Sequence, residues 1–248
     1  MKILNNNVHD NLKILADICN ENLHSDKEIS EYINLRQLSP TTVEKFKIGA
    51  FPKDVRNVLK YVHPTVLKDA GIIYNASSST FKSYYRFVIP VQDASGNFIG
   101  IAGRALMPDD ERKFLRIPKY KNSIYNKSKV LFGLNYAKTT IRNKNSVIVV
   151  EGNLDVISCH QAGIYNVVAT CGTLLTERHI IMLSRYTDNI NILFDNDPAG
   201  NMAAERFIKK RAKNGINLKK LTIPTHKDAD EFIKNNSIEQ VNLFFQNH

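Results

Sequence analysis

The spacing of apolar side chains predicts a chain that begins with helices. Ser39 and Pro40 mark one helix start, because serine suits the N-cap and proline suits the first turn. Residues 54–71 keep a helical pattern despite Pro64. Other segments with helical spacing are residues 11–23 and about 26–36.

The pattern changes over residues 84–104. Two runs rich in β-branched and aromatic residues, YYRFVIPVQ and NFIGIAGR, flank a turn at Asp93–Gly96. Such runs predict two strands joined as a hairpin. Residues 112–132 are expected to be irregular with short strands.

From residue 146 onward, apolar strands alternate with helices. The first strand, Val147–Val150, is a continuous β-branched run that ends at Glu151. This alternation is typical of an α/β fold with a parallel sheet covered on both faces. We therefore expect an α+β subdomain over residues 1–145 and a Rossmann-like domain over residues 146–248. The later expected elements are a helix at about 154–162, a strand at 166–170, a helix at about 176–186, a strand at 189–195, a helix at about 199–213, a strand at 218–224 and closing helices at about 228–248.

Charge is distributed unevenly between these two parts. The net charge is +10, and residues 112–144 hold ten Lys or Arg but no Asp or Glu. Aromatic residues are interleaved with these cations. Because cations neutralise phosphates and aromatic faces stack on unpaired bases, the pattern favours a nucleic-acid surface over a merely solvated face.

Composition excludes several classes of protein. No run is apolar and long enough to cross a membrane, and the N-terminus lacks a signal-peptide pattern, so a cytoplasmic protein is expected. The three cysteines, Cys19, Cys159 and Cys171, are far apart, which excludes a zinc ribbon within the chain and favours small buried side chains.

Acidic residues follow three of the expected parallel strands. Glu151 follows the first strand, Asp195 and Asp197 end the third, and Asp228 and Asp230 lie just past the fourth. Ligands gather beyond the carboxyl ends of such strands. Any one of these motifs could be a turn or a helix cap, but together they predict a site for Mg²⁺ or Mn²⁺, with room for two ions.

The second half contains the motifs EGNLDV, HQAG, ATCGT, DNDPAG and KDADE. With these motifs it resembles a Toprim domain, and in particular that of DnaG-type primases. Asn153, Asn196 and Ala229 depart from the family pattern without removing a carboxylate. The resemblance implies that Glu151, Asp195, Asp197, Asp228 and Asp230 bind metal, that the first three are catalytic, and that Asp155 supports them.

The first half resembles the same family through RQLSPTTVEKFKIGAFP, the strand pair ending in AGR, PKYKNS and NKSKVLFGL. Ala102 replaces the first glycine of that strand-end motif. Lys113, Arg116, Lys121 and Lys129 fit a diffuse track for the template backbone, and equally well exposed cations on a loop. The positions that the resemblance assigns to nucleotide or template binding are Arg86, Arg104, Lys119, Tyr120, Asn122 and Lys127.

The resemblance implies a primase, a nucleotidyltransferase that makes RNA primers on single-stranded DNA from ribonucleoside triphosphates. Members of the family usually carry a zinc ribbon and a helicase-binding domain, so a separate zinc-ribbon protein and a replicative helicase are expected partners. A phage or mobile-element system is one expected setting. Two alternatives stay open: a Toprim nuclease, and a degenerate primase-like module that binds DNA without turnover.

Overall fold

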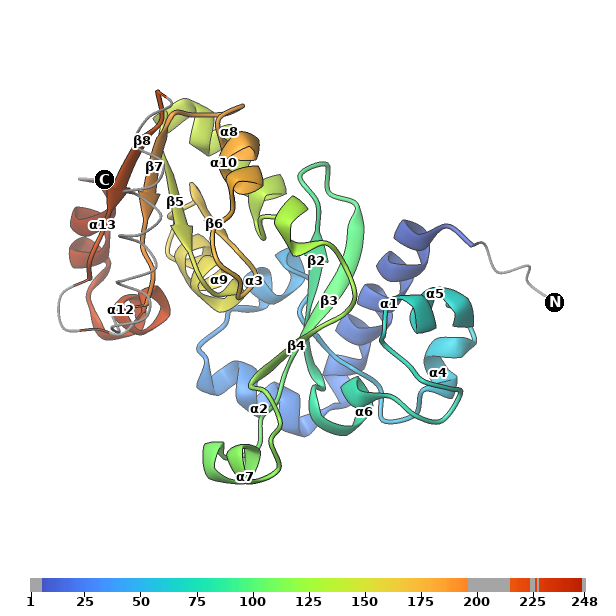
Figure 1. Ribbon diagram of the computed structural model, residues 1–248. Coiled ribbons are helices and arrows are strands. Elements are labelled where there is room, and N and C mark those ends of the chain that lie inside the picture. Colours follow the sequence, from blue (N-terminus) through green and yellow to red (C-terminus); the bar gives the residue numbers. More distant parts are fainter. Residues whose placement is uncertain (1–5, 196–214, 224–225, 227, 247–248) are drawn as a thin grey trace. The chain divides into compact units, whose positions relative to one another are not determined.

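The computed structural model of the chain describes residues 6–195, 215–223, 226 and 228–246 (Figure 1). It divides into two compact units. The first unit comprises Met1–Gln92 and Asn97–Tyr125, and the second comprises Asp93–Gly96 and Asn126–His248. No helix in the described part of the chain is long and apolar enough to span a lipid bilayer.

The first unit starts with short helices that match the predicted starts. Asp26 caps the second helix by accepting from the backbone N–H of Ile29, and Ser39 caps the third, whose first residue is Pro40. Pro64 opens a helix of its own instead of interrupting one. The helices of this unit are α1 (Val8–Asn22), η1 (Leu23–Ser25), α2 (Lys27–Leu35), α3 (Pro40–Lys45), α4 (Arg56–Leu59), α5 (Pro64–Asp69), α6 (Thr80–Tyr84) and α7 (Asp109–Phe114).

An antiparallel sheet of four strands forms the rest of the first unit, in the order β1 (Gly49–Ala50), β2 (Phe87–Gln92), β3 (Phe98–Arg104) and β4 (Tyr120–Asn122). The predicted pair β2–β3 is confirmed. The register places Arg104 opposite Tyr120. Directly opposed side chains in an antiparallel pair are close neighbours, so these two predicted binding residues come together through strand pairing.

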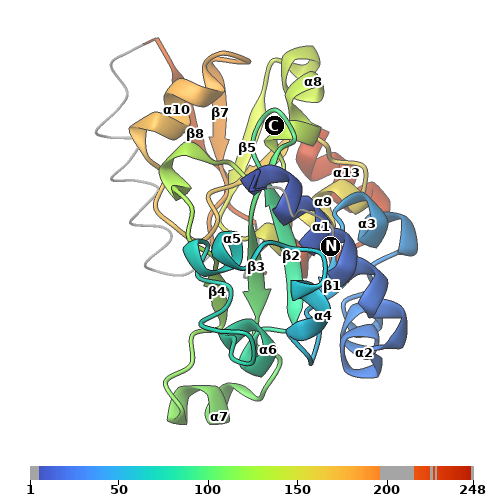
Figure 2. The same ribbon diagram turned by 90° about the vertical axis from the view of Figure 1, so that its right-hand side faces the viewer.

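Helix α1 packs against β1 and β3 of this sheet (Figure 2). A Cβ atom at Gly49 would lie 2.3 Å from the backbone carbonyl of Cys19, so helix and strand meet backbone to backbone. The side-chain amides of Asn20 and Asn22 donate to the carbonyls of Ile48 and Ala50, at 2.8 and 2.9 Å. Hydrogen bonds from side-chain amides to the residues on both sides of Gly49 therefore hold helix α1 close to strand β1.

Helix α7 differs from the sequence prediction, which expected irregular chain from residue 112. The helix buries none of its residues, so its sequence carries no apolar periodicity. Its start is marked instead by Pro108 and by acidic residues in the first turn, which suit the positive end of a helix dipole.

Among its described residues, the second unit contains a parallel sheet of four strands in the order β6-β5-β7-β8. Its described elements are η2 (Lys127–Lys129), α8 (Leu134–Lys144), β5 (Val147–Val150), α9 (Asn153–Gln161), β6 (Val167–Ala169), α10 (Glu177–Leu183), β7 (Asn189–Ile192), β8 (Asn217–Lys220), α12 (Ala229–Asn235) and α13 (Ile238–Gln246). The α/β class is confirmed. The helix expected at 199–213 lies outside the described residues.

Helices cover both faces of this sheet. Val147 and Val149 of β5 share a core with α8 and α10, while Ile148 and Val150 are buried on the opposite side, where α9 packs. Helix α8 belongs to this core, although the sequence prediction placed the domain boundary near residue 145. The unit begins earlier, at Asn126, because the segment before β5 supplies buried apolar side chains.

Candidate functional site

The acids that follow β5 and β7 lie together at the carboxyl edge of the parallel sheet. These strands are neighbours, so their ends meet. The backbone N–H of Asp195 donates to Glu151 Oε1 at 3.2 Å. The structure thus brings together two of the residues that the sequence predicted, through a bond that depends on the strand register.

Asp155 is buried behind them in the first turn of α9. Its carboxylate accepts the backbone N–H of Gly152 at 3.1 Å and that of Asp230 at 3.2 Å. Burial raises the pKa of Asp155 to about 8, helped by the negative charges of Asp228, Asp195 and Asp230 and opposed by the Asp230 N–H. The raised pKa of Asp155 therefore indicates that several acidic side chains lie near it.

The two acids past β8 have different surroundings. Asp228 is the N-cap of α12 and accepts from the backbone N–H of Glu231 at 2.8 Å. Asp230 is buried, accepts a hydrogen bond from Ser158 Oγ, and forms an ion pair with Lys234 at 2.9 Å. Ser158 and Lys234 were missed by the sequence reasoning, although the Asp-to-Lys spacing of four on a helix is a usual pairing signal.

The loop after β6 borders the same edge. The N–H of Gly172, a residue with φ +70°, donates to the Glu151 carbonyl at 3.1 Å. The hydroxyls of Thr170 and Thr173 each donate to the other residue's carbonyl, at 2.6 and 2.8 Å. These bonds close the loop formed by residues 170–173.

The chemistry of this edge suits a hard divalent cation. Carboxylates crowded together repel one another, and a cation between them removes that cost without protonation. Within residues 6–195, 215–223, 226 and 228–246, however, no three His, Cys, Asp or Glu side chains converge as a ligand set. Asp197 lies outside the described residues. The full ligand set therefore stays a prediction.

Arg104 of the first unit lies between two aromatic rings. Its guanidinium carbon is 5.5 Å from the centre of the Tyr32 ring and 5.1 Å from that of Tyr120, and Nη1 donates to the Tyr120 hydroxyl. Cation–π contacts and this hydrogen bond fix the plane of the guanidinium. Tyr32, on α2, was missed because its only sequence signal is an aromatic residue on a helix.

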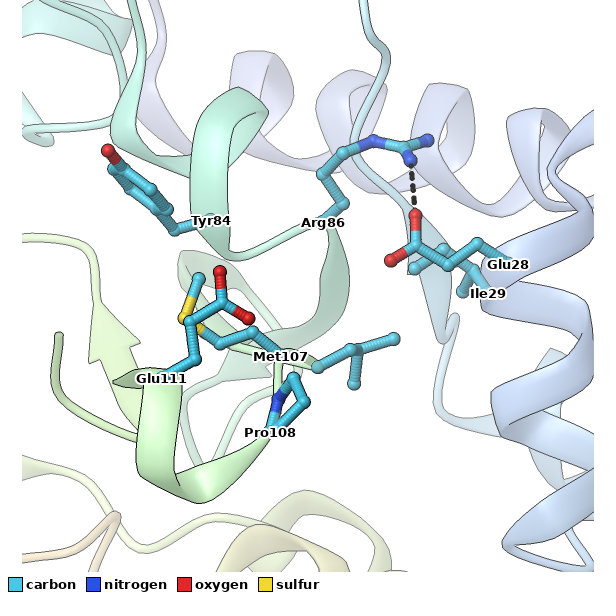
Figure 3. A pocket seen from close by; sticks show the side chains of 8 residues that line it. Glu28, Ile29, Tyr84, Arg86, Met107, Pro108 and Glu111 are labelled. Atoms are coloured by element: carbon cyan, nitrogen blue, oxygen red, sulfur yellow. Dashed lines mark hydrogen bonds and ion pairs between the residues drawn. The ribbon is translucent and has the colours of Figure 1, made fainter. Parts of the chain in front are cut away.

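Arg86 occupies a different environment, at a pocket of about 340 Å³ (Figure 3). It forms ion pairs with Asp26 and with Glu28, the latter at 3.1 Å, and Nε donates to the Phe51 carbonyl. Burial lowers the pKa of this guanidinium. The predicted role in phosphate binding would require a nucleotide to compete with these carboxylates. Glu111, Tyr84 and Met107 line the same pocket.

The remaining predicted cations and amide are partly open. Lys119 is exposed just before β4, and Asn122 ends that strand and accepts from the Tyr125 hydroxyl at 2.7 Å. Lys127, in η2 of the second unit, is half-buried. The three cysteines are buried and free of disulfides, as predicted.

Comparisons with known proteins cover both units. Residues 18–138 match a family described as the N-terminal domain of the DNA primase catalytic core, and residues 148–233 match a Toprim-like family. A DNA primase of Aquifex aeolicus is 33% identical over 226 residues, which cover 89% of this chain and 45% of that protein. The chain spans less than half the length of the curated relatives it resembles.

Solved structures agree with the sequence matches. A structure of the DnaG catalytic core superposes with a TM-score of 0.82 at 30% identity, covering 97% of this chain and 79% of that one. A DnaG primase catalytic domain bound to single-stranded DNA gives a TM-score of 0.81 at 28% identity, covering 97% and 80%. The similarity therefore extends over both units.

Proposed function

Because the chain belongs to the family of DnaG-type DNA primase catalytic cores, we propose that it joins ribonucleotides into short RNA primers on single-stranded DNA. The hydrogen bond from the Asp195 N–H to Glu151 is the main support for the proposal. It brings two acidic residues that match the family's motifs together at one edge of the sheet. A family member bound to single-stranded DNA supports the choice of template. The proposed setting is the cytoplasm of a bacterium, with or without an infecting phage.

The acids are proposed to hold two divalent cations, Mg²⁺ or Mn²⁺. Such ions, when bound, supply positive charge that favours an ionised attacking hydroxyl and a departing pyrophosphate. Asp155 stays behind this set as a support. Glu151 has two possible roles, ligand or proton acceptor, and both are compatible with its place beside Asp195. The proposed ligands are Glu151, Asp195, Asp197, Asp228 and Asp230.

The basic residues are proposed to hold the template and the incoming triphosphate. Arg104 offers a guanidinium whose orientation is fixed by two rings, which suits bidentate contact with phosphate oxygens. Lys127 offers a mobile point charge. The proposed set is Arg86, Arg104, Lys119, Tyr120, Asn122 and Lys127, and a zinc-ribbon protein and a replicative helicase are the proposed partners.

The test separates extension from initiation. The chain is given labelled ribonucleotides, Mg²⁺ or Mn²⁺, and single-stranded DNA carrying an annealed RNA primer. We expect primer extension, and a loss of about 10³-fold in Asp195→Ala, since metal-assisted charge stabilisation contributes several kcal/mol. Asp188→Asn, an exposed acid at the other end of β7, is the matched control and should retain activity.

Three outcomes would contradict the proposal. These are no extension under any of these conditions, full activity in Asp195→Ala, and degradation of the DNA without added nucleotides. The last would favour the nuclease alternative. DNA binding without metal-dependent turnover would favour the binding module.

A further inference from the structure

A buried histidine holds the η2 turn against the start of α10. His179, in the first turn of α10, is fully buried, and its Nε2 lies 2.9 Å from the carbonyl oxygen of Lys127. A carbonyl only accepts hydrogen bonds, so Nε2 carries the hydrogen and donates it. The bond joins positions that are 52 residues apart in sequence.

The other ring nitrogen has a separate task. Nδ1 of His179 accepts the backbone N–H of Thr176 at 3.2 Å, and the Thr176 hydroxyl accepts the His179 N–H at 3.3 Å. This reciprocal pair caps α10. Burial lowers the pKa of His179, which favours the neutral ring that both bonds require. Since capping needs only Nδ1, the bond to Lys127 serves something other than the helix.

That bond fixes the backbone of a predicted phosphate-binding residue. The Lys127 carbonyl also accepts the N–H of Val130, a buried residue, and Asn126 Oδ1 accepts the N–H of Ser128 at 3.1 Å. The Lys127 ammonium itself has no hydrogen-bond or ion-pair partner among the described residues. The backbone of Lys127 is thus held by hydrogen bonds, while its ammonium group can still bind a ligand.

We propose that His179 is a positioning residue for Lys127, which directs the ammonium at the phosphates of an incoming ribonucleoside triphosphate. The inference rests on the proposed function for the identity of the ligand. It differs from a purely structural role, in which His179 would only stabilise α10 and any loss of the cap would have the same effect.

Two substitutions at the same position separate these roles. In His179→Asn the amide oxygen replaces Nδ1, so the cap is kept and the bond to Lys127 is lost. In His179→Gln the amide nitrogen takes the place of Nε2 and can donate to Lys127 again. Thr176→Ala is the cap control, because it weakens the cap and leaves the Lys127 carbonyl bonded.

The measurement is the affinity of the full chain for ATP with Mg²⁺, by calorimetry. We expect Lys127→Ala to weaken binding about tenfold and His179→Asn about fivefold, since one charge-assisted contact is lost or misplaced. His179→Gln and Thr176→Ala should stay within about twofold of the wild type. In the Lys127→Ala background, His179→Asn should have no further effect.

Several results would overturn the inference: full ATP affinity in Lys127→Ala or in His179→Asn, additive losses in the double variant, no recovery in His179→Gln, or an equal loss in Thr176→Ala. Thermal unfolding of each variant checks folding. If His179→Asn does not fold, Asn126→Ala releases the same turn from its other side and should weaken ATP binding only when Lys127 is present.

ATP affinity needs no turnover, so the two proposals fail separately. A chain that shows the predicted coupling but never extends a primer contradicts the primase assignment alone. A chain that extends primers but shows additive losses contradicts the positioning role alone.

Discussion

The acids of the parallel sheet and the arginines of the antiparallel sheet are held in place by different partners. Glu151 and Asp155 accept hydrogen bonds from backbone N–H groups that come within reach only when the strands and helices have formed. Arg104 is held by the rings of Tyr32 and Tyr120, and Arg86 by carboxylates. The acids therefore depend on the fold as a whole, whereas each arginine depends on one or two side chains.

This difference decides where single substitutions should act. Only substitution with proline removes a main-chain donor, so most single substitutions should leave the bonds of Glu151 and Asp155 in place unless a buried charge is left alone. The contacts of Arg104 can be altered one side chain at a time with little effect on stability.

The largest effect on stability is expected from Lys234→Met. Asp230 has only 8% of its side chain exposed, and the substitution removes the cation that pairs with this carboxylate. We expect the free energy of unfolding to fall by about 2–3 kcal/mol, somewhat below a fully buried pair because Lys234 is partly exposed. Urea unfolding measures the change.

Lys27→Met is the matched control. Lys27 and Glu31 are also four residues apart on a helix, but their side chains are 90% and 67% exposed. Removal of such a pair should change stability by less than about 0.5 kcal/mol. Equal effects of the two substitutions would show that the Asp230 pair is no more important than a surface pair.

A smaller effect follows from the raised pKa of Asp155, about 8 against 3.8 for an ordinary aspartate. Between these values the folded protein keeps a proton that the unfolded chain has released, so stability falls as pH rises. In EDTA, Tm should drop by several degrees from pH 5 to pH 8, and less in Asp155→Asn. Asp188→Asn should keep the wild-type slope. An unchanged slope in Asp155→Asn would contradict the assignment.

The smallest effect is expected at Tyr32. Tyr32→Leu removes one ring from Arg104 and should weaken binding of labelled single-stranded DNA about two- to fivefold at fixed ionic strength. Tyr32→Phe keeps the ring and should bind like the wild type. Anisotropy titrations compare the two, and equal losses in both would show that the ring face is not what holds Arg104.

The sequence predicted the parts of the fold that rest on apolar periodicity. The strands β2, β3 and β5 and the cap at Ser39 follow directly from local pattern. Helix α7 was missed because it buries nothing. The unit boundary was placed late because the apolar residues of α8 do not reveal which sheet they cover.

The candidate site was predictable in its residue types but not in its connections. The pattern placed Glu151 and Asp195 at the ends of the first and third expected strands, and the structure makes those strands neighbours, so the two residues come together. The bonds of Ser158 to Asp230 and of His179 to Lys127 span 72 and 52 residues of sequence, which no local pattern encodes. Lys234 is only four residues from Asp230, so its pairing did have a local signal. The resemblance gave Arg86 a ligand-binding role, while its ion pair with Asp26 depends on tertiary packing.

The close packing of α1 on β1 restricts which residues can replace Gly49. At Gly49 the first atom of any side chain would collide with the main chain of Cys19. A library that randomised this position should recover glycine almost alone. Strong selection at such a site would reflect steric exclusion between two backbones, and a conservation map alone would mistake it for chemistry.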